Sequence, residues 1–362
     1  MHVLFVAPHF PANQRQFVLA LAAAGARVTG IGEPGVEYLD DELKRAMIGY
    51  EQVRSVCDVQ ALFDAVRRVQ KRGWVDRLET TVEAHISAAA EVREAAKIPG
   101  LTVEQATLCR DKPVMKDFLR RHGINTAAST AAETAEEIRA FAAEVGYPLI
   151  LKPRAGAGAD GTRKVSSDAE LEAAMRASGI GSGRSIAVEE YIEGHEGFYD
   201  TLTVGGEVIY DFASHYYPNV LEAMRNRWVA PQILVTNRVD SAPGYSELKA
   251  MGRQVIEAMK LGTTATHMEW FFGPRGLKFS EIGARPPGVR TWDLYCAGNG
   301  IDLYREWANA IVHGRVFSPL SREFATGLVA IRPDRDGRID RYEGVEATQR
   351  RFGQWILDAH LP

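Results

Sequence analysis

Two glutamates, Glu269 and Glu281, lie on segments that predict a β-hairpin. Residues 266–272 (THMEWFF) alternate as a strand does, a GPRG turn follows, and residues 277–282 (LKFSEI) form the returning strand. If the hairpin pairs Glu269 with Glu281, the two carboxylates face each other. At about 4 Å they would repel by roughly 4 kcal/mol at an effective dielectric constant near 20. A divalent cation removes this repulsion, and Mg²⁺ favours one or two protein carboxylates together with substrate phosphates. The hairpin therefore predicts a Mg²⁺ site, unless a shifted register places both glutamates on a solvated face.

The two-residue period of a strand predicts which neighbours share a face with these glutamates. It places His267 and Phe271 with the first glutamate, and Phe279 and Gly283 with the second. Beside such a site, His267 could bind the carboxylate of a second substrate or deprotonate its amine. The alternative is a histidine that only packs in the core or supports its neighbours.

A glycine-rich loop follows a predicted strand, residues 149–152, that ends in Lys152. Residues 162–165 (TRKV) after the loop favour a returning strand, whereas a dinucleotide-binding loop would open a helix. The loop is therefore predicted to be a flap between antiparallel strands, with bare amides that cover a polyphosphate and Lys152 neutralising charge beneath it. The alternative is a surface turn without a ligand. A protein kinase is excluded because neither HRD nor DFG occurs. The glycines of the GxGxxG pattern are Gly156, Gly158 and Gly161.

Other elements must position these residues. Alternating strands and helices in the first hundred residues predict a parallel sheet covered by helices. Its first turn, residues 8–11 (PHFP), has no glycine and cannot admit a pyrophosphate, which argues against a nicotinamide-binding unit. Asp111 can cap a helix that ends near Gly123, and the chain then becomes rich in strands. Strands are expected at residues 149–152, 186–192, 199–204, 207–212, 264–272 and 277–282.

Composition excludes several classes of protein. The 362 residues are 46% hydrophobic and 25% charged, which is typical of a soluble globular protein and excludes a disordered chain. A net charge of −4 lacks the positive excess of a non-specific nucleic-acid-binding protein. Cys57, Cys109 and Cys296 are widely spaced, which favours buried thiols in a reduced, cytoplasmic compartment. The opening segment does not resemble a signal peptide, and no stretch approaches the roughly 20 apolar residues of a membrane span. We therefore expect no nucleic-acid or membrane partner.

Four segments, in this order, resemble the ATP-grasp superfamily of carboxylate–amine and carboxylate–thiol ligases, over about residues 1–315. The THxE stretch is most similar to ligases that join amino acids, such as L-amino acid α-ligases. The four segments are Asp111-Lys112-Pro113 with its helix, residues 151–165 (LKPRAGAGADGTRKV), residues 188–196 (VEEYIEGHE) and residues 266–288.

The resemblance implies a role for each matching residue. Lys112 and Lys152 would contact the phosphates of ATP, and the glycine flap would close over them. Glu196 would hold the ribose hydroxyls. Arg285 would hold the substrate carboxylate or its phosphorylated form. The linker whose backbone reads adenine would be Glu189, Glu190, Tyr191 and Ile192. The ligands of Mg²⁺, for which Mn²⁺ can substitute, would be Glu269 and Glu281.

The implied architecture is α/β and α+β. An N-terminal parallel-sheet (pre-ATP-grasp) domain comes first, a central lid carries the flap, and an antiparallel-sheet domain carries the metal site. ATP would lie between the last two. The expected boundaries are 1–105, 106–187, 188–315 and, for an extension packing on the core, 316–362.

One position departs from the family pattern. Many members carry Asn where this chain has Gly283, so one metal would be held less completely, and the number of metal ions is open. Arg285 and His267 are also expected in the acceptor pocket, and so are residues from stretches without clear periodicity. These additional candidates for substrate contact are Tyr216 and Arg225, together with Arg290, which closely follows Arg285 in the sequence.

The predicted reaction is ATP-dependent carboxylate–amine ligation. Transfer of the γ-phosphoryl group makes an acyl phosphate, an amine attacks it, and ADP and phosphate are released. The expected partners are a small carboxylate and an amine, with amino acids as the expected kind, and a homodimer is implied by the resemblance alone. Two alternatives stay open: a bicarbonate-activating carboxylase of the same fold, and a nucleotide-binding module without catalysis.

Overall fold

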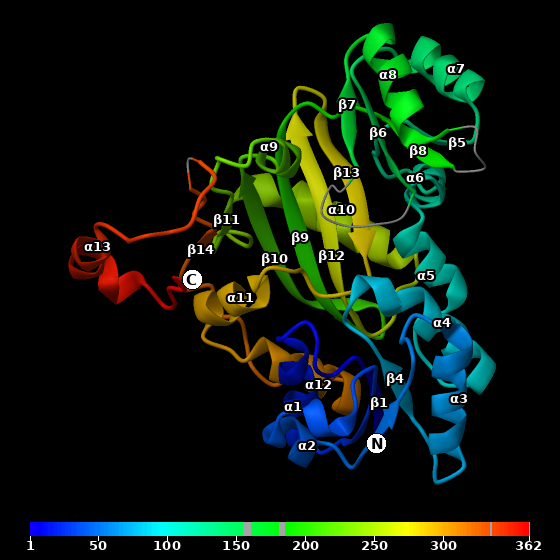
Figure 1. Ribbon diagram of the computed structural model, residues 1–362, viewed down its shortest axis with the longest axis vertical. Coiled ribbons are helices and arrows are strands. Elements are labelled where there is room, and N and C mark those ends of the chain that lie inside the picture. Colours follow the sequence, from blue (N-terminus) through cyan, green and yellow to red (C-terminus); the bar gives the residue numbers. More distant parts are fainter. Residues whose placement is uncertain (155–160, 181–184, 334, 362) are drawn as a thin grey trace.

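The computed structural model describes residues 1–154, 161–180, 185–333 and 335–361 (Figure 1), and the statements below concern these residues. Their named strands form three sheets. A parallel sheet is built from the N-terminal residues, a small antiparallel sheet lies in the lid, and a larger antiparallel sheet occupies the centre. The predicted α/β and α+β class is confirmed.

The N-terminal sheet has the order β3-β2-β1-β4 with parallel pairs, as the alternation of strands and helices predicted. β1 (HVLFV) is buried along its whole length, as expected of the central strand in a sheet covered on both faces. Helices α3 and α4 cover one face. The bounds are β1 (His2–Val6), β2 (Arg27–Gly32), β3 (Gly49–Gln52), β4 (Arg77–Glu79), α1 (Gln14–Ala23), α2 (Asp41–Ala46), α3 (Val59–Gln70) and α4 (Ile86–Ala96).

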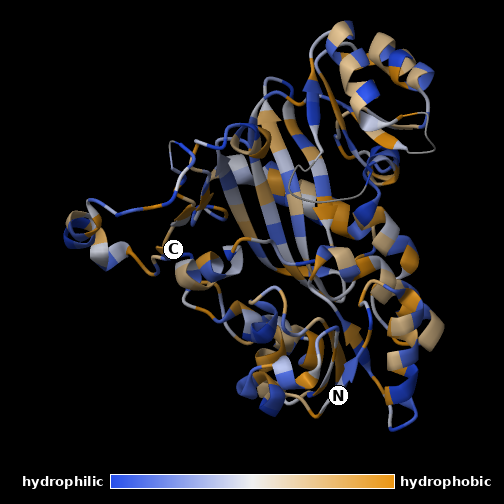
Figure 2. Cartoon of the chain, in the orientation of Figure 1, coloured by the Kyte–Doolittle hydropathy of each residue, from blue (hydrophilic) through white to orange (hydrophobic). Residues whose placement is uncertain are grey.

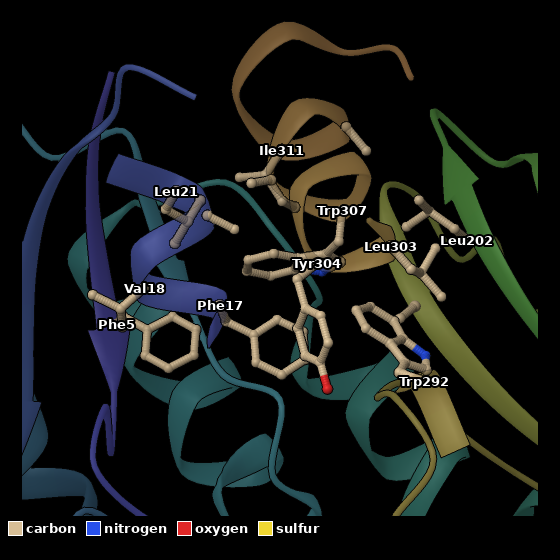
Figure 3. Packing of buried hydrophobic residues seen from close by; sticks show 14 of the residues in the cluster. Phe5, Phe17, Val18, Leu21, Leu202, Trp292, Leu303, Tyr304, Trp307 and Ile311 are labelled. Atoms are coloured by element: carbon tan, nitrogen blue, oxygen red, sulfur yellow. The ribbon is translucent and has the colours of Figure 1, made fainter. Parts of the chain in front are cut away.

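The other face of this sheet is covered by α1 together with α12 (Leu303–His313), which is more than 200 residues away in the sequence. Figure 3 shows the aromatic contact between them. The ring of Phe17 lies 5.0 Å from that of Trp307 and 5.1 Å from that of Trp292, measured between centroids. The N-terminal unit therefore shares a core with the C-terminal half of the chain.

The lid sheet has the order β5-β8-β6-β7, and all its pairs are antiparallel. β6 and β7 flank the glycine loop, and Leu151 pairs with Arg163, so the loop joins antiparallel strands as predicted. Gly156 and Gly158 lie outside the described residues. The bounds are β5 (Ser129–Ala132), β6 (Leu149–Pro153), β7 (Arg163–Val165), β8 (Ile186–Glu190), α7 (Ala135–Val145) and α8 (Asp168–Ser178).

The central sheet has the order β13-β12-β9-β10-β11-β14. Figure 2 shows hydrophobic and hydrophilic residues alternating along its strands. In β9, Phe198 faces the core with α11 and α12, whereas Tyr199 faces the core with α10. The bounds are β9 (His195–Val204), β10 (Glu207–Tyr217), β11 (Gln232–Val235), β12 (Thr264–Gly273), β13 (Gly276–Gly283), β14 (Thr326–Val329), α9 (Val220–Arg225), α10 (Ser246–Ala258) and α11 (Thr291–Asn299).

Three expectations about the organisation are corrected. The helices α5 (Val103–Arg110) and α6 (Lys112–Arg121) pack on the central sheet rather than in the lid, because their apolar residues join the core of α10 and β12. The boundary expected at 187–188 falls inside β8. Of the expected extension, β14 pairs with β11, but residues 335–361 are largely exposed, and α13 (Val345–Phe352) projects away from the core (Figure 1).

Two further observations concern single features. Cys57 is exposed, contrary to the expectation of buried thiols, whereas Cys109 is buried and Cys296 is half-buried. No helix in the described part of the chain is long and apolar enough to cross a membrane.

Candidate active site

A cavity of about 390 Å³ opens between the lid sheet and the central sheet. Its walls come from β6, β8, α9 and the β12–β13 hairpin, so four segments distant in sequence meet there. Among the predicted site residues, those that line it are Lys112, Lys152, Glu189, Glu190, Tyr191, Ile192, Glu196, Arg225, Glu269 and Glu281.

The hairpin has the predicted register. β12 and β13 are antiparallel, Glu269 pairs directly with Glu281, and both side chains line the cavity. Phe271 lines it too, in keeping with the strand period.

A β-bulge corrects the prediction for one neighbour. The register shifts between Glu269 and Trp270, because Trp270 pairs with Phe279 and leaves Ser280 as the extra residue. Phe279 therefore lies in the apolar core with Trp270, not beside Glu281, and Ser280 lines the cavity in its place.

The two facing carboxylates have pKa values shifted in opposite directions. Burial, followed by the charges of Glu281 and Glu196, raises the pKa of Glu269 to about 8. Burial also disfavours the Glu281 carboxylate, but Lys112 and Lys152 outweigh it and lower its pKa. Of the pair, Glu281 is therefore ionised, and ionisation of Glu269 as well is unfavourable.

Such a pair fits a divalent cation, whose charge would offset both the burial and the repulsion that favour the protonated form of Glu269. Within the described residues, no group of three or more His, Cys, Asp or Glu side chains is placed to hold a metal. Further ligands would have to come from water and phosphate, which is the usual arrangement for Mg²⁺.

Two lysines converge on the carboxylates. Lys112 Nζ lies 3.2 Å from Oε2 of Glu281, and Lys152 Nζ lies 3.9 Å from the same oxygen. Lys152 also bonds Glu189 at 2.9 Å. Burial disfavours the Lys152 ammonium, but the carboxylates of Glu189 and Glu281 outweigh it and raise its pKa. Positive charge is thus held at the side of the cavity where phosphates could bind.

A third lysine was missed by the sequence analysis. The fully buried Lys116 places Nζ 2.6 Å from Oε2 of Glu189, the oxygen that Lys152 also contacts. Burial lowers the pKa of Lys116 to about 8, and the two lysines, despite the burial of the carboxylate, lower that of Glu189 to about 2. Lys112 and Lys116 are four residues apart and so share one face of α6, a signal that could have indicated Lys116.

The predicted linker crosses from β8 to β9. Glu190 is held by Lys278 at 3.1 Å, by Arg275 and by the N–H of Ala128, so it is anchored to the hairpin. Lys164 of β7 lies 3.6 Å from the centroid of the Tyr191 ring. Among hydrogen bonds between described residues, the N–H of Ile192 takes part in none, so it is available to a ligand.

Glu196 is buried and lines the cavity. Its Oε2 accepts a 2.7 Å hydrogen bond from the N–H of Val220, and Asn219 bridges the N–H of Glu196 and the carbonyl of Gly194. Burial raises the pKa of Glu196 to about 7. The first turn of α9 therefore fixes the carboxylate, and Arg225, at the end of the same helix, lines the cavity.

His267 is positioned by a buried network that the sequence analysis did not include. Its Nδ1 lies 2.7 Å from one oxygen of Asp200, and the hydroxyl of Tyr295 donates to the other at 2.5 Å. Nε2 of His267 lies 3.9 Å from Glu269. An Nδ1–H that donates to Asp200 leaves Nε2 as an acceptor on the side of the carboxylates.

Arg285 is not among the residues that line the cavity. Its Nε donates to Glu83 at 2.7 Å, and its Nη1 donates to the carbonyl of Pro286 at 2.9 Å. The nearby charges of Asp200 and Glu269 help to raise its pKa against burial, although Glu83 is the larger contributor. Glu83 belongs to the N-terminal unit, and no local pattern indicated it.

Three predicted residues have separate surroundings. The ring of Tyr216 lies 4.8 Å from that of Phe198, and burial, with the charges of Glu269, Glu196 and Asp200, raises its pKa well above 10. Tyr216 is therefore close to the carboxylates.

Arg290 does not lie near the carboxylates. It is exposed and pairs with Asp293 and with Asp358 of the C-terminal segment. Gly161 follows the loop with φ of +68°, a conformation that favours glycine.

The raised pKa of Glu269 predicts how stability depends on pH. Because its folded-state pKa of about 8 exceeds the ordinary 4.5, the metal-free fold should lose stability as pH rises from about 5 to about 8; Glu196 contributes with the same sign. Mg²⁺ should therefore raise the melting temperature more at pH 8.5 than at pH 5.5. Glu269→Gln should flatten both trends in thermal melts. Equal Mg²⁺ effects at both pH values would contradict the assignment.

The comparisons with known proteins agree with this geometry. Residues 111–198 match the family model described as the ATP-binding domain of the carbamoyl-phosphate synthase L chain. The crystal structure of an L-amino acid ligase from Bacillus licheniformis superposes with a TM-score of 0.66 at 19% identity, covering 87% of this chain and 77% of that one. The chain has the ATP-grasp fold.

The chain is also similar to another amino acid ligase and to a carboxylase domain. The L-arginine-specific L-amino acid ligase of Bacillus subtilis is 25% identical over 318 residues, which cover 85% of this chain and 75% of that protein. A biotin carboxylase domain dimer of Hydrogenobacter thermophilus, solved with MgADP, ADP and bicarbonate, gives a TM-score of 0.64 at 19% identity, with 89% and 71% covered. The expected resemblance to the ATP-grasp superfamily is confirmed.

Proposed function

We propose that this protein is an ATP-dependent carboxylate–amine ligase that forms an amide through an acyl phosphate. The observation that carries the proposal is the directly paired Glu269 and Glu281 in a cavity where Lys112 and Lys152 approach the same carboxylate. This arrangement suits a nucleotide polyphosphate with a divalent cation. The similarity to amino acid ligases supports amino acids as substrates.

The nucleotide would lie along the cavity wall. The N–H of Ile192 would bind the adenine edge, and the Glu196 carboxylate would accept hydrogen bonds from the ribose hydroxyls. Lys112 and Lys152 would bind phosphate oxygens, exchanging part of their contact with Glu281 for the ligand. Glu269 and Glu281 would hold Mg²⁺, which when bound neutralises charge on the phosphate oxygens.

The chemistry would proceed in two displacements. An oxygen of the substrate carboxylate attacks the γ-phosphorus, the bond to the β–γ bridging oxygen breaks, and ADP leaves. The amine nitrogen then attacks the carbonyl carbon of the acyl phosphate, and the carbon–oxygen bond breaks to release phosphate. Arg285 would hold the acid, and Nε2 of His267, with Nδ1 fixed by Asp200, would accept the proton that the amine loses.

A phosphate-release screen over pairs of amino acids, with ATP and Mg²⁺, tests the proposal. The expected result is release of phosphate and ADP that requires both substrates, with a dipeptide mass in the products. AMP and pyrophosphate would instead indicate adenylation and overturn it. Turnover that requires bicarbonate would select a carboxylase, as the similarity to the biotin carboxylase domain allows. Tight ATP binding without ADP formation would select a non-catalytic module.

A homodimer stays a proposal that rests on the resemblance and on the dimer named for one similar structure. Sedimentation of the full chain at several concentrations would decide it.

A further inference from the structure

Glu83 reaches from the N-terminal unit into the catalytic half of the chain. It lies on the short helical turn η2 (Glu83–His85) after β4, 202 residues before Arg285 in the sequence. Its Oε2 accepts from Nε of Arg285 at 2.7 Å, and its Oε1 accepts from Nη1 of Arg110 at 2.6 Å. One carboxylate thus joins two arginines that belong to different elements.

The position of Glu83 explains the glycine at 283. A Cβ built on Gly283 would lie 2.9 Å from Oε2 of Glu83, so the carboxylate would have to shift. The end of a glutamate side chain can usually move, but this one is bonded to Arg285 and Arg110, and a shift would disturb those bonds. Gly283 lies in β13 and is not among the residues with positive φ, so its backbone would accept other residues. Glycine within a strand often marks a close approach of another group, and here that group is the Glu83 carboxylate.

The same contact sets the charge next to the metal-binding hairpin. Gly283 shares the face of β13 with Glu281. The cluster of Arg110, Glu83 and Arg285 beside it carries a net charge of +1, which favours an anion, while the nearby charges of Asp200 and Glu269 oppose one. Nη2 of Arg285 makes no hydrogen bond to any described residue and is available for that anion.

We propose that Glu83 occupies the space left by Gly283 and positions Arg285 to bind the carboxylate substrate. The inference rests on the proposed function, because it assumes that Arg285 receives a carboxylate. Glu83 is a positioning residue: with Nε and Nη1 held by Glu83 and Pro286, the planar guanidinium can turn only its remaining edge to the substrate. The N-terminal unit thereby takes part in choosing the acid.

A stability cycle tests the shared space without any turnover. Gly283→Asn alone should lower the melting temperature, whereas the same change in a Glu83→Ala background should cost much less, because the carboxylate is gone. Strong non-additivity of this kind supports the inference. Equal effects of Gly283→Asn with and without Glu83 would overturn it.

Kinetics test the positioning. Glu83→Gln should raise the KM of the carboxylate substrate by about 10- to 100-fold, the range for loss of a charge-assisted hydrogen bond, while the Kd of ADP stays the same. The matched control is Glu91→Gln. It makes the same change at an exposed residue of α4 in the same N-terminal unit, and it should leave the KM unchanged. An unchanged KM and kcat in Glu83→Gln would overturn the inference. If the wild type releases no phosphate with any pair, the proposed function fails separately, and the stability cycle alone decides the inference.

Discussion

Glu281→Gln is expected to lower the rate of ADP formation by about 10²- to 10³-fold, the range for loss of one preorganised electrostatic group at a reacting centre. Glu281 is the point at which Lys112, Lys152 and the paired Glu269 meet, at 3.2 Å and 3.9 Å for the two lysines. The amide keeps the shape of the side chain but removes the charge that holds a cation. Steady-state kinetics at saturating ATP would measure the loss.

Binding of Mn²⁺ in the presence of ADP gives a second readout that does not depend on turnover. Electron paramagnetic resonance should show weaker Mn²⁺ binding in Glu281→Gln than in the wild type. Glu257→Gln on the exposed side of α10 is the matched control and should change neither quantity. Turnover of Glu281→Gln within threefold of the wild type would contradict the assignment of the metal site.

Glu189→Gln is expected to destabilise the fold by about 3–5 kcal/mol, the cost of leaving buried charge without its partner. The carboxylate of Glu189 is the common counterion of Lys116 at 2.6 Å and Lys152 at 2.9 Å. Lys116 is fully buried, and the Lys152 side chain is 12% exposed. Without it, two ammonium groups would face each other in a medium that solvates them poorly. Urea unfolding would measure the loss.

A charge-balanced double variant gives the control. Lys116→Met combined with Glu189→Gln removes one charge of each sign and should recover a large part of the stability lost in Glu189→Gln. The deficit of the single variant should also shrink as pH rises toward about 8, the wild-type pKa of Lys116. Loss of Glu189 lowers that pKa further, so Lys116 in the variant becomes neutral below about pH 8 and then needs no counterion. Equal stability of the single and double variants at pH 7 would show that Glu189 does not balance these lysines.

Local pattern was sufficient for the features whose partners lie close in sequence. The alternation on both sides of the GPRG turn predicted that Glu269 faces Glu281, and the TRKV stretch predicted that the glycine loop joins antiparallel strands. In both cases a short turn brings neighbouring segments together, so residue period and turn chemistry determine the pairing. The pattern did not predict the bulge at Ser280. One extra residue in the strand places Phe279 on the opposite face of the sheet, but the alternation of residue types looks the same with or without it.

The sequence by itself therefore determined the class of fold, the carboxylate hairpin and the segments that would surround a nucleotide. Only the tertiary structure decided which charges meet: Lys116 and Lys152 on Glu189, Asp200 on His267, and Glu83 on Arg285. These contacts join segments up to 202 residues apart and depend on how three sheets pack together. The periodicity of residue types depends only on neighbours within about one helical turn or one hairpin. It therefore cannot predict contacts between segments this far apart in the sequence.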